Sequence, residues 1–404
     1  MSEKINIQVI EGGVCAAEGV RASAATAGIK ESGNPDITLI AFDPPAEAAG
    51  VYTRNLVCAA PVVLCRERVG KGPLRAILVN SGNANACTGQ TGLSDAYHLC
   101  DGIAGVLGSK SDEVVMSSTG LIGANLPVEL LEAKFGELVA GLSKGGGTAS
   151  AEAIMTTDTR PKEYAVLVEL PEGTVRIGGM SKGAGMIAPN MATMLAYVTT
   201  DAAVSSELLA KLLREASDMS FNCVTIDGDT STNDTAILAA TGASGVRVES
   251  GETLELFETA LKQVCLELAL AIVRDGEGVT KVVQLRVEGA TSDEDARLAA
   301  RSVSESLLVK TAINGNLPNW GRIFAAAGYS GAALDQERLY LKFDDIEVAR
   351  DGAPIGGQDD SLRKVLEKPE YTVTLGLGVG DASSNFWTTD LSREYVTINA
   401  DYRT

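Results

Sequence analysis

The sequence predicts an α/β fold in which layers of β-sheet are covered by helices. Short apolar segments rich in β-branched residues alternate with longer amphipathic segments of helical period along both halves of the chain. The sequence contains no solenoid-type repeat and no low-complexity tract. Because 404 residues exceed what one hydrophobic core usually organises, we expect two subdomains or one large layered domain.

The first third of the chain is predicted to contain strands followed by helices. Apolar segments bounded by turns predict strands at 36–42, 51–57 and 76–80. Helical periodicity predicts helices at 93–108 and 126–142. The glycine-rich stretch SKGGGTAS, residues 143–150, is the best linker candidate in this half.

A predicted hairpin leads into the most unusual stretch of the sequence. Residues 163–170 and 174–179 pair across Pro171-Glu172-Gly173. They are followed directly by GMSKGAGMIAPNMATMLAYVTTDA, residues 179–202. A glycine-rich turn after a strand is a common place to display a reactive group. The question is whether Thr193, in the run MATML, reacts or packs.

The second half repeats the mixture of strands and helices. Helices are predicted at 205–217 and from Leu254 to about Val273, and strands at 222–226 and 280–289. A capping box, in which Thr291 and Glu294 satisfy orphan amides reciprocally, predicts a further helix through about Val309. Three predicted strands close the chain, at 338–343, 371–379 and 394–402.

Charge and composition argue against several functions. The net charge of -19 argues against a nucleic-acid or anionic-membrane partner, because the overall field repels both. The N-terminus lacks a basic stretch followed by an apolar core, and no apolar run has the length needed to cross a bilayer. We therefore expect a soluble cytoplasmic protein. An acidic body can still hold a basic pocket for a small substrate.

Cysteine and histidine usage argues against metal sites. The seven cysteines are dispersed without a C-x-x-C pair, so we expect reduced, mostly buried thiols and neither a disulfide framework nor a zinc site. His98 is the one histidine, and it lies in the predicted helix 93–108, where a surface or packed position is the simplest interpretation. We expect nucleophilic chemistry in this chain to use another base.

Known ligand-binding loops do not fit the glycine-rich and aspartate-rich motifs. A P-loop requires Gly-Lys-Ser/Thr after its spacer, whereas Gly178 leads to Gly183-Ala184. Residues 183–188 match a dinucleotide fingerprint only weakly, because a proline and a strand follow where a helix is needed. Residues 227–234, DGDTSTND, resemble the start of a calcium loop but lack its twelfth-position carboxylate. A polar turn between two strands is the better interpretation.

Thr193 has two interpretations. A β-branched residue that enters a buried strand is ordinary. Alternatively, a threonine becomes its own catalytic unit if the preceding peptide bond is cut, because the freed α-amino group, with a pKa near ~8, becomes a base beside the hydroxyl. Spacing alone favours the packing interpretation.

Several segments, taken together, favour the reactive interpretation of Thr193 over the packing interpretation. They are GGMSKGAGMIAPNMATMLAYVTTDA, EGGVCAAEGVRASAATAGIK, AAGVYTRNLVCAAPV, VNSGNANACTG, SSTGLIG, AIMTTDT, VRDGEGVTK, LPNWGRIFAAAGYSG and DLSREYVTINADYRT. From about residue 11 to the end, these segments closely resemble the ornithine acetyltransferase family, also called ArgJ. The resemblance covers essentially the whole chain, and the first of these segments is similar to the cleavage-site segment of that family.

The resemblance implies both a fold and an activity. The fold is a layered αββα sandwich of the N-terminal-nucleophile-like DmpA/ArgJ type. Self-cleavage between Ala192 and Thr193 gives two chains, 1–192 and 193–404, which stay associated as two of each. Thr193 then carries the acetyl group of N-acetyl-L-ornithine to L-glutamate, so that ornithine and N-acetylglutamate are released. This is the glutamate N-acetyltransferase reaction of arginine biosynthesis.

The same resemblance assigns the other site residues. Thr119 and Gly120 supply the oxyanion hole. A lysine and a glutamate among the substrate contacts suit the carboxylate and ammonium groups of an amino acid. These contacts are Thr156, Lys182, Thr193, Glu277, Asn399 and Thr404. No metal or organic cofactor is implied beyond the substrates.

The sequence leaves alternatives open. It does not decide whether acetyl-CoA also serves as an acetyl donor, or whether another acetylated amino acid is preferred. One rival is an N-terminal-nucleophile amidohydrolase or aminopeptidase of the same fold, in which water replaces glutamate as the acceptor. A second rival is a non-catalytic, acidic binding protein that keeps only the fold.

Overall fold

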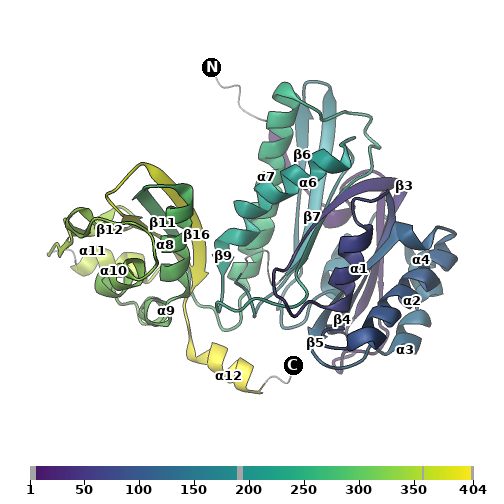
Figure 1. The fold of residues 1–404 in the computed structure, drawn as a ribbon, viewed down its shortest axis with the longest axis horizontal. Helices are drawn as coiled ribbons and strands as arrows, with labels where there is room; N and C mark the ends of the chain where they lie inside the picture. The colour runs from purple at the N-terminus through teal and green to yellow at the C-terminus, as the bar shows by residue number, and fades with distance from the viewer. Residues whose placement is uncertain (1–5, 189–193, 357–358, 402–404) are drawn as a thin grey trace.

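The computed structural model describes residues 6–188, 194–356 and 359–401. These residues form two lobes, a large one around a nine-stranded sheet and a small one around a seven-stranded sheet (Figure 1). The small lobe is built mainly from residues 282–389, together with the short strand β9 (Val224–Thr225). The last helix, α12 (Arg393–Asp401), leaves the small lobe and lies below it in Figure 1, level with the lower end of the large lobe.

The strands of the large sheet follow the order β1-β6-β7-β8-β10-β3-β4-β5, and β2 pairs with β3. They are β1 (Ile7–Ile10), β2 (Val20–Ala25), β3 (Ile37–Tyr52), β4 (Leu74–Asn83), β5 (Val114–Leu121), β6 (Lys162–Leu170), β7 (Gly173–Lys182), β8 (Leu195–Thr200) and β10 (Thr235–Ala240). The helices of this lobe are α1 (Ala60–Arg68), α2 (Gly89–Leu107), α3 (Val128–Glu132), α4 (Phe135–Gly141), α5 (Gly147–Ala153), α6 (Ser206–Asp218) and α7 (Gly251–Arg274).

The long strand β3 divides the large sheet into two layers. Residues 37–41 pair with β2 and β4, whereas residues 47–52 pair with β10, and the register shifts between Ala41 and Ala46. One layer therefore contains β2, β4, β5 and the start of β3. The other contains β1, β6, β7, β8, β10 and the end of β3.

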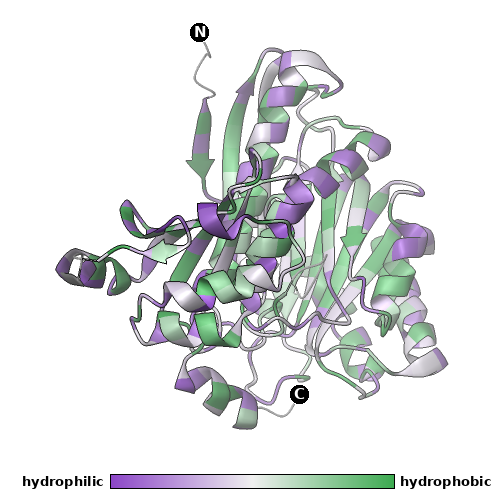
Figure 2. Ribbon diagram, turned by 60° about the vertical axis from the view of Figure 1, so that its left-hand side comes forward, coloured by the Kyte–Doolittle hydropathy of each residue, from purple (hydrophilic) through white to green (hydrophobic). Residues whose placement is uncertain are grey.

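Alternating side chains on β8 and β10 show how the layers stack. Tyr197 and Ile237 belong to the core that also contains β4 and β5, whereas Val198 and Leu238 belong to the core formed with α6 and α7. Helices α6 and α7 lie on one outer side, and α2 and α4 lie on the other (Figure 1). The strands between them are mostly hydrophobic (Figure 2). The expected αββα sandwich is therefore confirmed in the large lobe.

The small lobe has its own core. Its strands follow the order β14-β13-β12-β15-β11-β16-β9, and its helices pack on them around Leu285, Val303 and Phe386. The other strands are β11 (Val282–Ala290), β12 (Tyr340–Phe343), β13 (Ile346–Arg350), β14 (Ala353–Pro354), β15 (Glu370–Gly376) and β16 (Ala382–Thr389). The helices are α8 (Asp293–Glu305), α9 (Leu307–Asn314), α10 (Trp320–Gly328) and α11 (Asp359–Leu366).

Several predicted elements are confirmed. The hairpin at 163–179 forms β6 and β7, and the helices predicted at 93–108, 205–217 and 254–273 correspond to α2, α6 and α7. Five of the seven cysteines are buried, as expected for packed thiols. Among the described residues, no helix combines the length and the apolar character that a membrane span requires.

Two local predictions in the first third are wrong. The strand predicted at 51–57 is the end of β3 and stops at Tyr52, because Thr53 Oγ1 and Asn55 Nδ2 donate to the carbonyls of Ser231 and Thr230 instead. The stretch 143–150 is no linker. Ser143 pairs with Ala22 of β2, and α5 begins at Gly147.

Two predictions in the second half are also wrong. Ser292, not Thr291, caps α8, and its hydroxyl accepts from the Asp295 N–H at 3.1 Å. The sequence predicts a strand at 394–402, but α12 covers most of these residues. The Ser392 hydroxyl accepts from the Tyr395 N–H and so favours a helical turn at the start of the segment.

The predicted boundary between the chains 1–192 and 193–404 lies outside the described residues, and it stays a prediction. The strands on either side of it are adjacent in one sheet, with Lys182 of β7 opposite Leu195 of β8. The two predicted chains therefore share the large sheet.

Candidate active site

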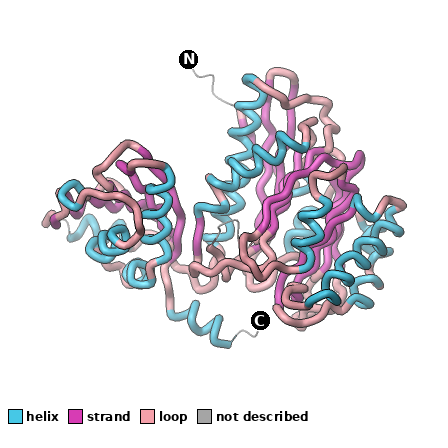
Figure 3. The backbone as a smooth tube through the Cα atoms, in the orientation of Figure 1, coloured by secondary structure: helices cyan, strands magenta, loops and turns pink. Residues whose placement is uncertain are grey.

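Loops from both lobes come together at the lower centre of Figure 3. Residues of several of these loops line a cavity of about 110 Å³. The ends of β5 and β7, the loops after α5 and α7, the turn between β9 and β10, and α12 form its walls. Its lining residues are Ala84, Thr119, Gly120, Ile122, Thr156, Thr157, Lys182, Gly185, Met186, Ser231, Thr232, Asn233, Glu277 and Asn399.

Six residues that the sequence assigned to the site line this one cavity, although they are spread over 281 positions of the chain. They are Thr119, Gly120, Thr156, Lys182, Glu277 and Asn399. Ala192, Thr193 and Thr404 lie outside the described residues.

Thr119 and Gly120 form the end of β5, where it runs parallel to β4. Gly120 has φ +129, and a Cβ atom there would lie 2.4 Å from the carbonyl carbon of Gly82. Only glycine fits this close approach. Thr119 and Gly120, which are consecutive in β5, both line the cavity.

Lys182 is the last residue of β7 and is buried in the cavity wall. Its Nζ atom donates to Thr156 Oγ1 at 2.8 Å and to Thr119 Oγ1 at 3.3 Å. Asp158 Oδ2 lies 3.9 Å from the same nitrogen. Burial lowers the pKa of Lys182, and the charge of Asp158 opposes that effect.

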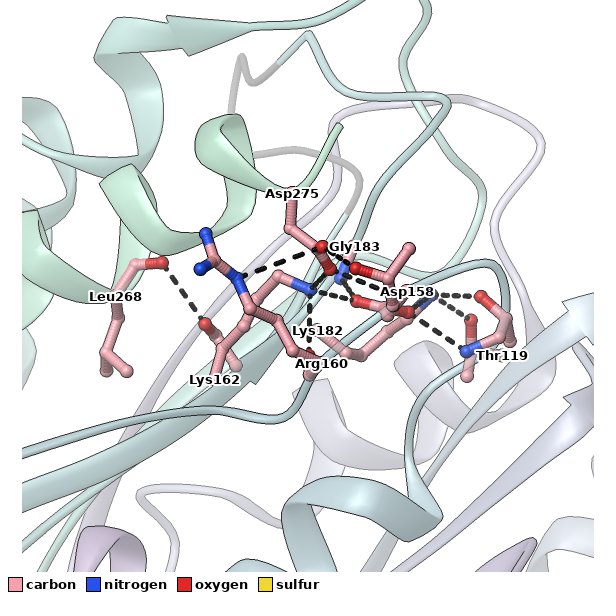
Figure 4. Close-up of polar contacts among 11 residues, drawn as sticks. Thr119, Asp158, Arg160, Lys162, Lys182, Gly183, Leu268 and Asp275 are labelled. Carbon is pink, nitrogen blue, oxygen red and sulfur yellow. Dashed lines mark hydrogen bonds and ion pairs between the residues drawn. The ribbon is translucent and has the colours of Figure 1, made fainter. Parts of the chain in front are cut away.

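Asp158 is a site residue that the sequence reasoning missed. It joins Lys182 and Lys162, and the polar contacts continue from Lys162 to Asp275 (Figure 4). Burial by itself would raise the pKa of Asp158, but the charges of Lys182 and Lys162 outweigh it and lower that pKa to about 2. The carboxylate is therefore ionised at neutral pH.

Glu277 follows α7, and its carboxylate accepts from Asn399 Nδ2 of α12 at 2.7 Å. The Glu277 N–H donates to the carbonyl of Ala184 at 2.8 Å. A Cβ atom on Gly185 would lie 2.5 Å from Glu277 Oε2, so glycine leaves the room that this carboxylate occupies. Asn399, one of the expected site residues, therefore lies on α12, in a segment that the sequence predicts as a strand.

The DGDTSTND segment forms the predicted polar turn between β9 and β10, but it also lines the cavity, which the sequence reasoning did not foresee. Its first residue, Asp227, accepts from the N–H groups of Met186 and Ile187 at 2.6 and 2.8 Å. Tyr395 of α12 donates its hydroxyl to the same carboxylate at 3.2 Å. Burial raises the pKa of Asp227. No group of three or more metal-ligating side chains occurs in the described residues.

The described residues on both sides of 189–193 are held beside these walls. The carbonyl of Ala188 accepts from Thr230 Oγ1 at 3.1 Å, and the carbonyl of Met194 accepts from the Thr235 N–H at 3.0 Å. His98, by contrast, lies on the exposed surface of α2, with its Nε2 atom 2.8 Å from Glu132 Oε1. The surface interpretation of this histidine is confirmed.

The fold and the cavity define a class of protein: an αββα enzyme whose site combines threonine hydroxyls, a lysine and a carboxylate, without a histidine among the described lining residues. The ArgJ family model matches residues 21–404. The chain belongs to the ArgJ family, as the sequence resemblance implied.

Individual relatives agree with this assignment. An arginine biosynthesis bifunctional protein ArgJ from Geobacter sulfurreducens is 50% identical, over 96% of this chain and 99% of the relative. One of the same description from Symbiobacterium thermophilum is 47% identical, over 98% of this chain and 99% of the relative. A crystal structure of the Bacillus halodurans ArgJ protein matches with a TM-score of 0.51 and 37% identity, over 52% of this chain and 100% of the solved chain.

Proposed function

We propose that this chain transfers the acetyl group of N-acetyl-L-ornithine to L-glutamate through an acetyl ester on Thr193. Its family makes it an acetyltransferase of arginine biosynthesis. The observation that carries the finer proposal is the convergence of Thr119, Gly120, Lys182 and Glu277 on one cavity, next to the fixed ends of the segment that contains Thr193.

The proposed nucleophile is created by self-cleavage between Ala192 and Thr193. The hydroxyl of Thr193 attacks the acetyl carbon, and its freed α-amino group takes the proton and passes it to the leaving ornithine amine. The neutral amine of glutamate then attacks the ester carbon, and the Thr193 oxygen leaves and regains a proton from that amine through the α-amino group. One difficult transfer thus becomes two easier ones. The solved Bacillus halodurans chain is matched along its whole length by about half of this chain, which is consistent with a family member cut near its middle.

The described residues supply two kinds of support for this chemistry. Thr119 and Gly120 can donate hydrogen bonds to the oxyanion that forms in each tetrahedral intermediate. Lys182 can pair with the carboxylate that ornithine and glutamate share, and the Glu277 carboxylate can accept a hydrogen bond from a nitrogen of the bound substrate. With Asn399 bound to Glu277, the carboxylate is oriented by α12. Thr156, Lys182, Thr193, Glu277, Asn399 and Thr404 are the proposed substrate contacts.

Initial-rate measurements test the reaction directly. The purified enzyme is expected to form N-acetylglutamate from N-acetyl-L-ornithine and glutamate with ping-pong kinetics. Release of acetate without transfer to glutamate would favour the amidohydrolase alternative instead. An unprocessed single chain on denaturing electrophoresis, inactive after folding, would favour the binding-protein alternative.

Four further features belong to the proposal. Acetyl-CoA serves as a second acetyl donor, as the description "bifunctional" of the relatives favours, and initial rates with acetyl-CoA and glutamate test this. No metal or organic cofactor is needed, so activity should survive dialysis against a chelator. The enzyme assembles from two copies of each chain, and light scattering tests this assembly. It acts in the cytoplasm, where the exposed thiol of Cys87 stays reduced.

A further inference from the structure

Asp158 lies behind the cavity wall and contacts three segments of the site. Its side chain is fully buried. Its two oxygens accept from the Gly183 N–H at 2.7 Å, the Thr156 N–H at 3.0 Å and Lys162 Nζ at 2.6 Å. One of them also lies 3.9 Å from Lys182 Nζ. Asp158 therefore fixes the backbone on either side of the cavity as well as the lysine between them.

A row of alternating charges continues from Asp158 into the protein. Lys162 Nζ donates to Asp275 Oδ2 at 2.6 Å, and Asp275 also accepts from the Thr159 N–H at 3.0 Å (Figure 4). Asp275 stands two residues before Glu277. The buried row Lys182, Asp158, Lys162 and Asp275 is electrically balanced, because two cations face two carboxylates. Such balance is what a buried charge requires.

The direction of the Lys182 hydrogen bonds has a chemical consequence for Thr119. The lysine donates to the oxygens of Thr119 and Thr156, and Asp158 lies on a further side of the same ammonium group. A hydroxyl oxygen that accepts from an ammonium group turns its own proton away from that group. The Thr119 proton is then free to point toward a ligand oxygen in the cavity.

We propose that Asp158 is a positioning residue for acetyl transfer, which holds the Lys182 ammonium group against Thr119 and Thr156 so that the Thr119 hydroxyl donates into the cavity. This inference rests on the proposed function. Asp158 itself does not touch the substrate. It acts through Lys182, and its negative charge favours the protonated form of that buried lysine.

The charged groups around Lys182 determine how the activity should depend on pH. Asp158, Glu277 and Asp234 favour the charged lysine, whereas Lys162 and Lys30 oppose it. Activity that needs charged Lys182 is lost as the pH rises through the pKa of this lysine. Removal of the Asp158 charge lowers that pKa and moves the alkaline limb of the kcat profile to lower pH. Removal of the Lys162 charge moves the limb the other way.

The test compares Asp158→Asn and Lys162→Met with the wild-type enzyme. We measure kcat and KM for acetyl transfer across the pH range and record the unfolding temperature. Each kcat is calculated per active site, and the amplitude of the burst of acetyl-enzyme gives the number of active sites. Asp158→Asn is expected to move the alkaline limb of the kcat profile to lower pH by roughly 1 pH unit or more. At neutral pH its kcat should fall by about tenfold or more, with a smaller change in KM.

Asp201→Asn is the matched control. The side chain of Asp201 is as fully buried as that of Asp158. It accepts from the Arg176 N–H at 2.8 Å and the Glu18 N–H at 3.2 Å, but it lies at the other end of the β7–β8 pair. It should lower the unfolding temperature and leave the alkaline limb in place.

Two results would overturn the positioning role. One is an alkaline limb in Asp158→Asn that coincides with those of the wild type and of Asp201→Asn. If Asp158→Asn does not fold, a limb in Lys162→Met that stays in place or moves to lower pH overturns it instead. Absence of acetyl transfer by the wild-type enzyme is a different result, because it refutes the proposed function itself.

Discussion

Replacement of Thr119 by alanine tests the proposed oxyanion hole most directly. The change removes the hydroxyl but leaves the Gly120 backbone, so one of two proposed donors is lost. Loss of one such donor typically costs about 2.7–4 kcal/mol of transition-state stabilisation, which corresponds to a fall in kcat of about 10²–10³. Lys182 keeps its shorter contact, to Thr156 at 2.8 Å. We therefore expect KM to change much less than kcat.

The assay separates this effect from incomplete processing. Steady-state transfer from N-acetyl-L-ornithine to glutamate is divided by the fraction of cleaved chain, which denaturing electrophoresis gives. Thr119→Ser, which keeps a hydroxyl at the same position, serves as the control and should retain most of the activity. A kcat of Thr119→Ala within tenfold of the wild type, less than about 1.4 kcal/mol, would refute the assigned role.

Three other predictions concern processing and stability. Thr193→Ala should leave one uncut chain with no transferase activity, since the hydroxyl is needed for both steps, and activity in that variant would contradict the mechanism. Asp227→Ala removes the acceptor for the Met186 and Ile187 N–H groups, so self-cleavage followed by electrophoresis over time should slow by about tenfold or more; an unchanged rate counts against this anchoring. The pKa of Asp158 is lowered from 3.8 to about 2 in the folded protein, so its stabilising contribution is present above 3.8 and is lost as the pH falls toward 2. Urea unfolding between these pH values should therefore show a steeper acid loss in the wild type than in Asp158→Asn, and equal slopes would contradict it.

Much of the fold could be predicted from the sequence because, in most segments, the local sequence pattern and the tertiary environment favour the same secondary structure. The hairpin at 163–179 has strand periodicity on both sides of a Pro-Glu-Gly turn, and α7 has a long apolar face. The segment 394–402 shows where they disagree. Its β-branched residues favour a strand, but a serine cap and contacts of Tyr395 and Asn399 with Asp227 and Glu277 favour a helix.

The site was predictable only where a motif stood in the sequence. Thr119, Lys182 and Glu277 were assigned through resemblance, and they converge on one cavity. Asp158 sits in one of the same quoted segments, but nothing local shows that it is buried against two lysines from β6 and β7. Asp227 stands in a segment that the sequence predicts to be a polar turn, which gives it no role in the site. Its contacts to Met186 and Ile187 join positions about 40 residues apart, which periodicity does not report.

The pairing of β7 with β8 has a consequence for how the enzyme refolds after denaturation. The precursor forms this pairing within one molecule, so its refolding does not depend on protein concentration. If the bond before Thr193 is cut as proposed, Lys182 and Leu195 belong to different chains, although they are paired in one sheet. Recovery after heating then requires two molecules to meet, and it should become slower and less complete as the solution is diluted. Maturation would thus turn a folding reaction of first order into one of second order.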